Sequence, residues 1–376
     1  MDTGAEGLRD CLVASTSLTH IDGERGHLTV VGHAVEEIAP RCSFEEACFL
    51  LFHHRLPDTA ELEHFGAGLQ RARALPAGLW AAARQAAADR VPPMDALMIL
   101  ATLLRRPGHD PQPVEIVAGL MMAAGCYARL LAGADPVTPP PRASHVAAYL
   151  HLVSGRVPHP AAVRALETYL VTVMDHGLNA STFAARVAAS THADLLSCTV
   201  AALAALKGPR HGGAPGPALE MVERIPDVAQ AADYLRAMLG RGERLMGFGH
   251  GVYRVRDPRA DVLAVALEQL VAAEVKGHDR TRALYRKARA VEQVALRVLA
   301  EHRPRARLQT NVEFYTALLL HAVGLDRELF TPTFAVARVV GWLAHAAEQR
   351  DSNVLLRPRA RYIGPRSRRW LPLAAR

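Results

Sequence analysis

Two histidines stand among glycines, one in GPRHGG (His211) and the other in GFGHG (His250). Glycine lets a backbone approach a ligand closely and turn its amides inward. Three arginines follow His250 within nine residues. A histidine on a glycine loop beside arginines suits an anion or a polarised carbonyl. Either histidine can instead be an incidental residue of an exposed turn, so the pattern alone leaves both interpretations open.

An arginine and a third histidine extend this set. Arg338 shares one face of a predicted helix with Gly341 and His345, and an arginine on an apolar stripe is costly unless an anion pairs with it. The alternative is a snorkelling or interface arginine. His176 lies in the polar turn MDHGLNAST, where Asn179 is a natural helix cap and the histidine can be a simple loop residue.

One carboxylate, Glu313, has two explanations. Thr310 and Glu313 form a capping-box pattern before an apolar run, which gives Glu313 a purely structural role. Taken together with the loop histidines and arginines, the same carboxylate suits general acid–base chemistry on a small polycarboxylate. The histidines lack metal-ligand spacing, so we predict no metal site.

Composition limits the kinds of partner. Of the net charge of +7, residues 351–376 contribute +6, and no basic stripe with interleaved aromatics runs through the rest, so we expect no nucleic-acid partner. Five cysteines without CxxC spacing, and a polar start without a signal-peptide core, favour the cytoplasm. The apolar run 116–128 is too short to span a bilayer, so we predict a buried helix and no membrane partner.

Periodicity predicts an all-α protein. Residues 43–56 form an expected helix capped by Ser43, and residues 180–206 read as one long Ala-rich helix that ends before Gly208 and Pro209. The segment HLTVVG, residues 27–32, is the one candidate arm of a small hairpin. Strands and helices do not alternate, which argues against a doubly wound sheet.

Several long motifs resemble, in order, those of the citrate synthases. They are HGLNASTFAARVAAST, GPRHGG, LMGFGHGVYRVRDPRADVL, NVEFYTALLL, FAVARVVGWLAHAAEQ and RPRARYIGP. The opening IDGERGHLTVVGHAVEEIA followed by SFEEACFLL also resembles the bacterial members. The resemblance covers nearly the whole chain and is weakest between about residues 58 and 143.

The resemblance implies a helical homodimer with its active site in a cleft. A large domain would comprise residues 1–213 completed by 325–376, and residues 214–324 would form a small domain. The implied reaction condenses acetyl-CoA with oxaloacetate and hydrolyses citryl-CoA. The CoA thioester would be a co-substrate, with no permanently bound cofactor.

The resemblance also implies a role for each motif residue. His211 would hydrogen-bond the thioester oxygen, Glu313 would be the α-proton base, and His250 would polarise the oxaloacetate carbonyl. The residues implied to hold oxaloacetate carboxylates are His176, Arg259, Arg338 and, from the other subunit, Arg357. Those implied to cradle the adenine end of coenzyme A are Leu245, Met246, Gly247, Phe248 and Gly249.

Three residues depart from the family pattern. Glu313 replaces the usual Asp, Pro215 stands where many members have Asn, and Gly251 stands where bacterial members commonly have Arg. These departures keep two alternatives open: a 2-methylcitrate synthase or related enzyme using propionyl-CoA or a longer acyl-CoA, and a non-catalytic protein that binds acyl-CoA or dicarboxylates.

Overall fold

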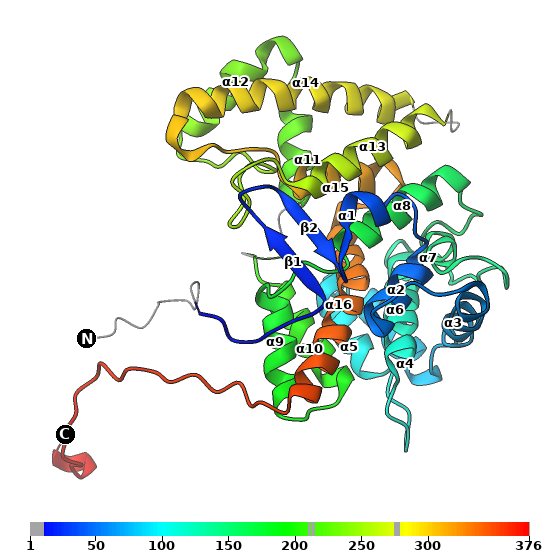
Figure 1. The fold of residues 1–376 in the computed structure, drawn as a ribbon, viewed down its shortest axis with the longest axis vertical. Coiled ribbons are helices and arrows are strands. Elements are labelled where there is room, and N and C mark those ends of the chain that lie inside the picture. The colour runs from blue at the N-terminus through cyan, green and yellow to red at the C-terminus, as the bar shows by residue number, and fades with distance from the viewer. Residues whose placement is uncertain (1–10, 210, 212–214, 274–278, 376) are drawn as a thin grey trace.

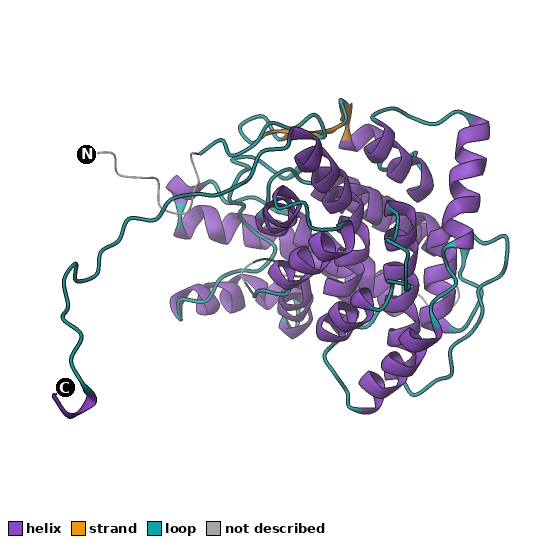
Figure 2. Ribbon diagram, turned by 90° about the horizontal axis from the view of Figure 1, so that it is seen from below, coloured by secondary structure: helices purple, strands orange, loops and turns teal. Residues whose placement is uncertain are grey.

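The computed structural model describes residues 11–209, 211, 215–273 and 279–375. In that part of the chain helices build nearly the whole body, and the strands form one small sheet at its edge (Figures 1 and 2). This confirms the predicted all-α class. The helices are α1 (Val35–Ile38), α2 (Phe44–His53), α3 (Thr59–Arg71), α4 (Ala77–Ala88), α5 (Pro93–Thr102), α6 (Pro113–Leu131), α7 (His145–Ser154), α8 (Pro160–Val173), α9 (Ala180–Ser190), α10 (Leu195–Leu206), α11 (Pro215–Arg224), α12 (Ala231–Gly240), α13 (Pro258–Ala272), α14 (Asp279–His302), α15 (Val312–Ala322) and α16 (Phe330–Ser352), with short 3₁₀ helices at Val228–Gln230, Pro304–Ala306, Arg327–Leu329 and Leu373–Ala375.

The sheet has three antiparallel strands in chain order: β1 (Thr19–Asp22), β2 (His27–Val30) and β3 (His33–Ala34). Strand β2 confirms the hairpin arm predicted from HLTVVG, and its partner is β1. The hairpin turn contacts a distant loop, because the carbonyl of Gly23 accepts a hydrogen bond from the backbone N–H of Arg254 at 2.9 Å. A Cβ atom at Gly23 would lie 2.4 Å from the Val252 carbonyl oxygen, so this approach requires glycine.

The capping signal at Ser43 marks a helix start correctly. Helix α2 begins after Ser43, whose hydroxyl and Glu46 form a reciprocal capping box, and it ends at His53 because His54 is left-handed. The single helix predicted over residues 180–206 is wrong. Helix α9 ends at Ser190, His192 adopts φ 60°, and Asp194 caps a separate helix, α10. A favourable cap at Asp194 outweighs the uniformly high helix propensity of the flanking alanines.

Helix α16 runs through the centre of the body and packs against α5, α6, α8, α9 and α10 (Figure 1). Its residues from Thr333 to Ala346 are all buried. A second group of packed helices comprises α11, α13 and α15, and α12 lies along α14 at one end of the molecule. The division of the chain into a large and a small domain stays a prediction.

Helix α6 contains the apolar run at residues 116–128. Every residue of that run is buried, as predicted. By length and composition α6 is the one candidate for a membrane-crossing helix in the described chain, and 72% of its apolar window is covered by the rest of the protein. Burial of this kind is typical of a core helix.

Candidate active site

The turn before α9 is fixed to one face of α16. Arg338 donates from Nε to the Val173 carbonyl at 2.6 Å, and His345 lies with Nε2 3.3 Å from Oδ2 of Asp175. Between them, Gly341 allows the close approach, because a Cβ there would meet the Met174 carbonyl oxygen at 2.5 Å. The turn that carries His176 is therefore positioned at three successive points along α16.

His176 is buried and faces the second glycine loop. Its Nε2 lies 3.1 Å from the Tyr253 hydroxyl, and its ring meets that of His250 edge-on at 5.6 Å between centroids. Burial lowers the pKa of His176 well below 6.5, and the nearby Arg259 and Arg338 lower it further. His176 is therefore a neutral hydrogen-bonding group.

His250 is held by the backbone of its own turn. Its Nδ1 accepts hydrogen bonds from the N–H groups of Val252 at 3.0 Å and Tyr253 at 3.2 Å. Burial, followed by the charge of Arg259, lowers the pKa of His250 to about 4. The accepting role of Nδ1 assigns the proton of the neutral ring to Nε2.

Arg259 points a second donor at the same place. Its guanidinium lies 3.4 Å from Nε2 of His250, and both groups are donors, so they converge on a position suited to an oxygen. Two hydrogen bonds to the buried Asp257, at 3.0 and 2.8 Å, fix the guanidinium. The same carboxylate accepts from the N–H of Val312 at 3.2 Å and so ties Arg259 to the start of α15.

The predicted adenine loop pairs with the segment before α15. The Gly249 N–H donates to the Gln309 carbonyl at 2.7 Å, and the Asn311 N–H donates to the Gly247 carbonyl at 2.9 Å. Gly247 has φ 87°, and a Cβ there would lie 2.8 Å from Cβ of Phe314. This pairing links the loop of His250 to the first turn of α15, which carries Glu313.

Glu313 does not take part in a capping box, so that interpretation is wrong. The N-cap of α15 is Asn311, whose Oδ1 accepts from the Glu313 N–H at 3.0 Å, while the Thr310 hydroxyl donates to Glu292 at 2.7 Å. Oε2 of Glu313 is buried without a hydrogen-bond partner. Burial raises the pKa of Glu313 to about 7, although Arg259 and Arg338 act in the opposite direction.

His211 follows α10 in the chain, and its ring faces the N-terminus of α9. The backbone N–H of Ser181 points at Nε2 of His211 at 3.3 Å, and the Ser181 hydroxyl is 2.8 Å from the same atom. Burial, followed by the charge of Arg338, lowers the pKa of His211 to about 4. The helix terminus also disfavours a cation here. Of the surrounding glycine loop, residues 210 and 212–214 lie outside the described residues.

Six of the seven predicted catalytic and carboxylate-binding residues surround one site. Arg338 interacts electrostatically with Asp175, Arg259 and Glu313, and burial lowers its own pKa to about 10. The six are His176, His211, His250, Arg259, Glu313 and Arg338. Arg357 is exposed on the segment after α16, which leaves the body (Figure 1). The role of each residue stays a prediction.

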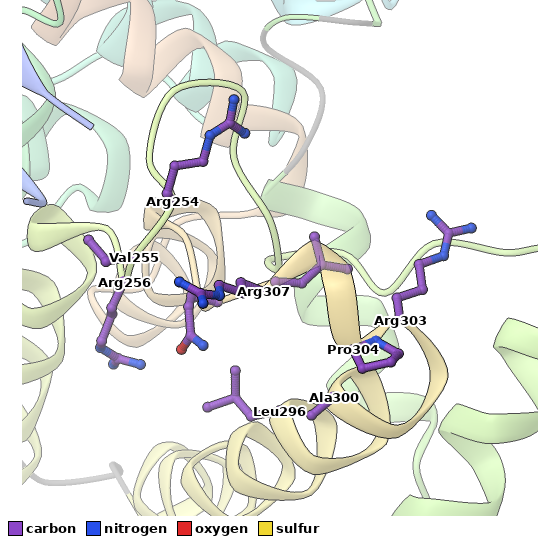
Figure 3. Close-up of a pocket in the computed structure, with 10 residues that line it drawn as sticks. Arg254, Val255, Arg256, Leu296, Ala300, Arg303, Pro304 and Arg307 are labelled. Carbon is purple, nitrogen blue, oxygen red and sulfur yellow. The ribbon is translucent and has the colours of Figure 1, made fainter. Parts of the chain in front are cut away.

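Several cavities adjoin the loop of His250, and one of about 460 Å³ is lined by Gly249, His250 and Tyr253. Two others contain the predicted coenzyme A residues or a group of arginines. Leu245, Phe248 and Gly249 line one of about 600 Å³ that reaches His250 itself, whereas Met246 and Gly247 are not in its lining. The other, of about 490 Å³, is surrounded by arginines from two segments (Figure 3). These arginines are Arg254, Arg256, Arg303 and Arg307. Among the residues that the structure describes, no acidic side chain lines it.

Sequence reasoning missed several residues of the site. Tyr253 contacts His176, Asp257 fixes Arg259, and Ser181 faces His211. The run DPR carried a usable signal for Asp257, because an acid before Pro at a helix start is a natural cap and lies within reach of the arginine two residues later. Tyr253 and Asp175 had no comparable signal.

The chain matches known proteins along its whole length. The family model described as citrate synthase, C-terminal domain, matches residues 7–359. Citrate synthase 2 of Bacillus subtilis is 35% identical over 384 residues, covering 100% of both chains. A 2-methylcitrate synthase of Shewanella oneidensis is also 35% identical, over 100% of this chain and 98% of its own. The solved ternary complex of Thermoplasma acidophilum citrate synthase with carboxymethyl coenzyme A and oxaloacetate superposes with a TM-score of 0.84 at 30% identity, over 98% of each chain.

An all-α fold with this site and these relatives defines an acyltransferase that acts on CoA thioesters. The chain belongs to the citrate synthase family. This confirms the resemblance drawn from the motifs.

Proposed function

We propose that this protein condenses acetyl-CoA with oxaloacetate to give citrate and CoA. The observation that carries the proposal is the Glu313 carboxylate, which has an unpartnered oxygen and a pKa of about 7 beside two arginines. A base whose pKa lies near the working pH is well matched to removing a weakly acidic α-proton. The same feature weighs against the non-catalytic binding protein, because binding alone does not need a buried base without a partner.

The surrounding groups divide the remaining steps. His211 donates from Nδ1 to the thioester oxygen while Glu313 takes the α-proton, and the resulting enol attacks the keto carbon of oxaloacetate to give citryl-CoA. Water then hydrolyses the citryl-CoA thioester, which releases citrate and CoA. His250 donates from Nε2 to the keto oxygen, and Arg259 and Arg338 hold the carboxylates. Neutral histidines suit both tasks, because each must supply a hydrogen bond to a developing negative charge without first losing a proton.

The cavities support binding of coenzyme A beside this site. The cavity lined by Leu245, Phe248 and Gly249 would take the adenine end. Arg254, Arg303 and Arg307 would provide cations for the phosphates, and Arg303 lines both cavities. Arg256 is already paired with Asp261 and Glu292. A Cβ at Gly251 would meet nothing within 4 Å, so the space of the missing family arginine is open.

We further propose a cytoplasmic homodimer in which Arg357 completes the partner's site. Arg357 is exposed and lies beyond the last turn of α16, on a segment that extends from the body (Figure 1). Mixing inactive Arg357→Ala and His211→Ala subunits should restore activity, because one of the two shared sites would then have both residues. Absence of recovery after proven subunit exchange would contradict a shared site.

The first experiment measures CoA release from acetyl-, propionyl- and longer acyl-CoAs in the presence of oxaloacetate, with products identified by mass. We expect the highest kcat/KM with acetyl-CoA. A preference for propionyl-CoA would instead identify a 2-methylcitrate synthase, the alternative supported by the Shewanella relative. Folded protein that binds acyl-CoA but releases no CoA from it would favour the non-catalytic binding protein.

Glu313→Gln tests the base directly. We expect exchange of the acyl α-protons with solvent to fall by about 10²–10⁴-fold, the usual contribution of a general base. Folding should be preserved, since the amide removes a charge that burial disfavours. Glu328→Gln, at an exposed position before α16, is the matched control and should retain full exchange. Full exchange in Glu313→Gln would remove this residue from the mechanism.

A further inference from the structure

The β1–β2 hairpin touches two turns of the candidate site. Strand β1 begins at Thr19, whose hydroxyl donates a hydrogen bond to Oδ2 of Asp175, the residue before His176. The hairpin turn after β1 contacts the loop of His250 through Gly23. We infer that this hairpin is a positioning element, which holds the His176 turn and the His250 loop at a fixed separation for oxaloacetate. The inference rests on the proposed roles of the two histidines in binding that substrate.

At one end, the hairpin packs against the turn that carries His176. Oδ2 of the buried Asp175 accepts from the Gly177 N–H at 3.3 Å as well as from the Thr19 hydroxyl. Ile21 lies on the same face of β1 as Thr19, and a Cβ at Gly177 would lie 3.4 Å from Cδ1 of Ile21. The hairpin therefore contacts this turn both through a hydrogen bond to a buried carboxylate and through apolar packing.

At the other end, Gly23 lies against the backbone that holds His250. Its carbonyl accepts from the Arg254 N–H at 2.9 Å, and a Cβ there would lie 2.4 Å from the Val252 carbonyl oxygen. The N–H of the same Val252 donates to Nδ1 of His250 at 3.0 Å. A displacement of the hairpin turn would therefore displace a residue that orients the His250 ring.

The hairpin is rigid enough to join its two ends. Strand β1 pairs with β2 along all four of its residues. Oδ1 of Asp22 accepts from the N–H groups of Glu24 at 3.1 Å and Arg25 at 3.0 Å, which fixes the turn. Strand β2 is anchored in the core by the buried side chains of Leu28 and Val30. A paired strand with a fixed turn transmits a displacement from one end to the other.

The two turns also meet each other directly. Nε2 of His176 lies 3.1 Å from the Tyr253 hydroxyl, and the rings of His176 and His250 are 5.6 Å apart. The hairpin adds a second connection between the same turns, through Asp175 at one end and the backbone of Val252 at the other. Their separation matters, because a misplacement of about 1 Å can cost about a hundredfold in rate.

Gly23→Ala tests the end at the His250 loop. The added Cβ would overlap the Val252 carbonyl, so the loop must shift. We expect the Kd for oxaloacetate, measured by calorimetry without acyl-CoA, to rise about tenfold.

Gly32→Ala is the matched control for hairpin stability. Gly32 has φ 79° between β2 and β3, but a Cβ there meets nothing within 4 Å. This variant should lower Tm through backbone strain and keep the parent Kd. A similar rise of Kd in both variants, or an unchanged Kd in Gly23→Ala, would overturn the inference.

Thr19→Val tests the end at the His176 turn, because it removes the hydroxyl and keeps the branched shape. We expect the Kd for oxaloacetate to rise about tenfold, the value of one hydrogen bond to a charged group. Combined with Gly23→Ala, the rise should be well below the product of the two single effects, since both act through one hairpin. Fully multiplicative effects would contradict a shared route. Thr29→Val, on the facing strand β2, is the matched control and should keep the parent Kd.

Hydrogen–deuterium exchange of the resting protein tests the connection without substrate. In the loop of His250, the N–H groups of Val252, Tyr253 and Arg254 donate to the histidine ring or to the hairpin turn. We expect Thr19→Val, at the opposite end of β1, to speed their exchange about tenfold. The acceleration should persist in the Tyr253→Phe background, which lacks the direct hydrogen bond between the two turns.

Unchanged exchange in the His250 loop, or an acceleration that disappears in the Tyr253→Phe background, would show that the hairpin does not connect the turns and would overturn the inference. Because this measurement needs neither substrate nor turnover, it separates failure of the inference from failure of the proposed condensation reaction.

Discussion

His211 and His250 reach the same charge state by different means. Nε2 of His211 faces the hydroxyl and N–H of Ser181, a residue 30 positions away in the chain. Nδ1 of His250 accepts from the N–H groups of Val252 and Tyr253, within three residues of itself. The pKa of each ring is lowered to about 4, chiefly by burial. The first restraint is tertiary, whereas the second is local.

The difference decides which ring nitrogen remains for the substrate. His211 uses Nε2 for its restraint and offers Nδ1, whereas His250 uses Nδ1 and offers Nε2 beside Arg259. Two neutral rings that donate from different nitrogens can each face an oxygen of a different substrate molecule. The comparison therefore predicts that the two histidines respond differently to the same substitution.

Amide substitutions should produce the largest contrast. The Asn amide occupies nearly the place of Nδ1, and the Gln amide nearly that of Nε2. We expect the mismatched variants, His211→Gln and His250→Asn, to lose about 10²–10³-fold in kcat, as for removal of an oxyanion donor. His211→Asn and His250→Gln should each retain about tenfold more activity than their mismatched partners, through one preserved hydrogen bond. Steady-state kinetics of the four variants checks this order.

The reverse order at either position would show that the nitrogen assigned to the substrate is the wrong one. Circular dichroism and Tm of each variant control for folding. Equal losses for Asn and Gln at both positions would remove the distinction between the two histidines altogether.

The glycines around His250 give the next contrast. Gly247→Ala would place a Cβ 2.8 Å from Cβ of Phe314 at φ 87°, so we expect a loss of about 2–4 kcal/mol in the free energy of unfolding. At Gly251 a Cβ meets nothing within 4 Å. The free energy of unfolding of Gly251→Ala should therefore stay within about 0.5 kcal/mol of that of the parent protein. Denaturant unfolding of both variants measures the difference. A stable Gly247→Ala protein would mean that the loop of His250 tolerates displacement from α15.

The pH dependence gives the smallest effect. Glu313 must be ionised to act as a base, and its pKa is about 7, so kcat/KM should fall about tenfold for each pH unit below 7. Both histidines should remain neutral between pH 5 and 8, because their pKa values are about 4. The pH–rate profile and NMR titration of the two rings test these statements separately. A ring that titrates near 6.5 would contradict its assignment as a neutral donor.

The same lowered histidine pKa values affect stability. A group whose pKa is lower in the folded state stabilises the fold above its unfolded pKa, here 6.5, and this contribution is lost as pH falls toward 4. Glu313 has the opposite sign, because its raised pKa favours the fold below 4.5 and this contribution is lost as pH rises through 7. We therefore expect acid unfolding to begin as the buried histidines become protonated.

Much of the fold could be predicted from local signals. Ser43 and Asn179 each cap the helix that follows, and the apolar run within α6 is buried, because caps and apolar runs act over a few residues. The same reasoning failed where two local signals competed. It joined α9 to α10, although Asp194 offers a better cap. It also kept open a capping box of Thr310 and Glu313, although the cap of α15 is Asn311.

The sequence by itself determined the kinds of group in the site and the family, because histidines, arginines and glycines in ordered motifs are visible along the chain. Only the tertiary structure decided which atoms face one another. The contact of Trp342 with Ser181, of Asp257 with both Arg259 and Val312, and of Gly23 with the loop of His250 all join segments that are close only after folding. A tautomer or a raised pKa depends on these partners and on burial, and neither quantity exists before the helices pack.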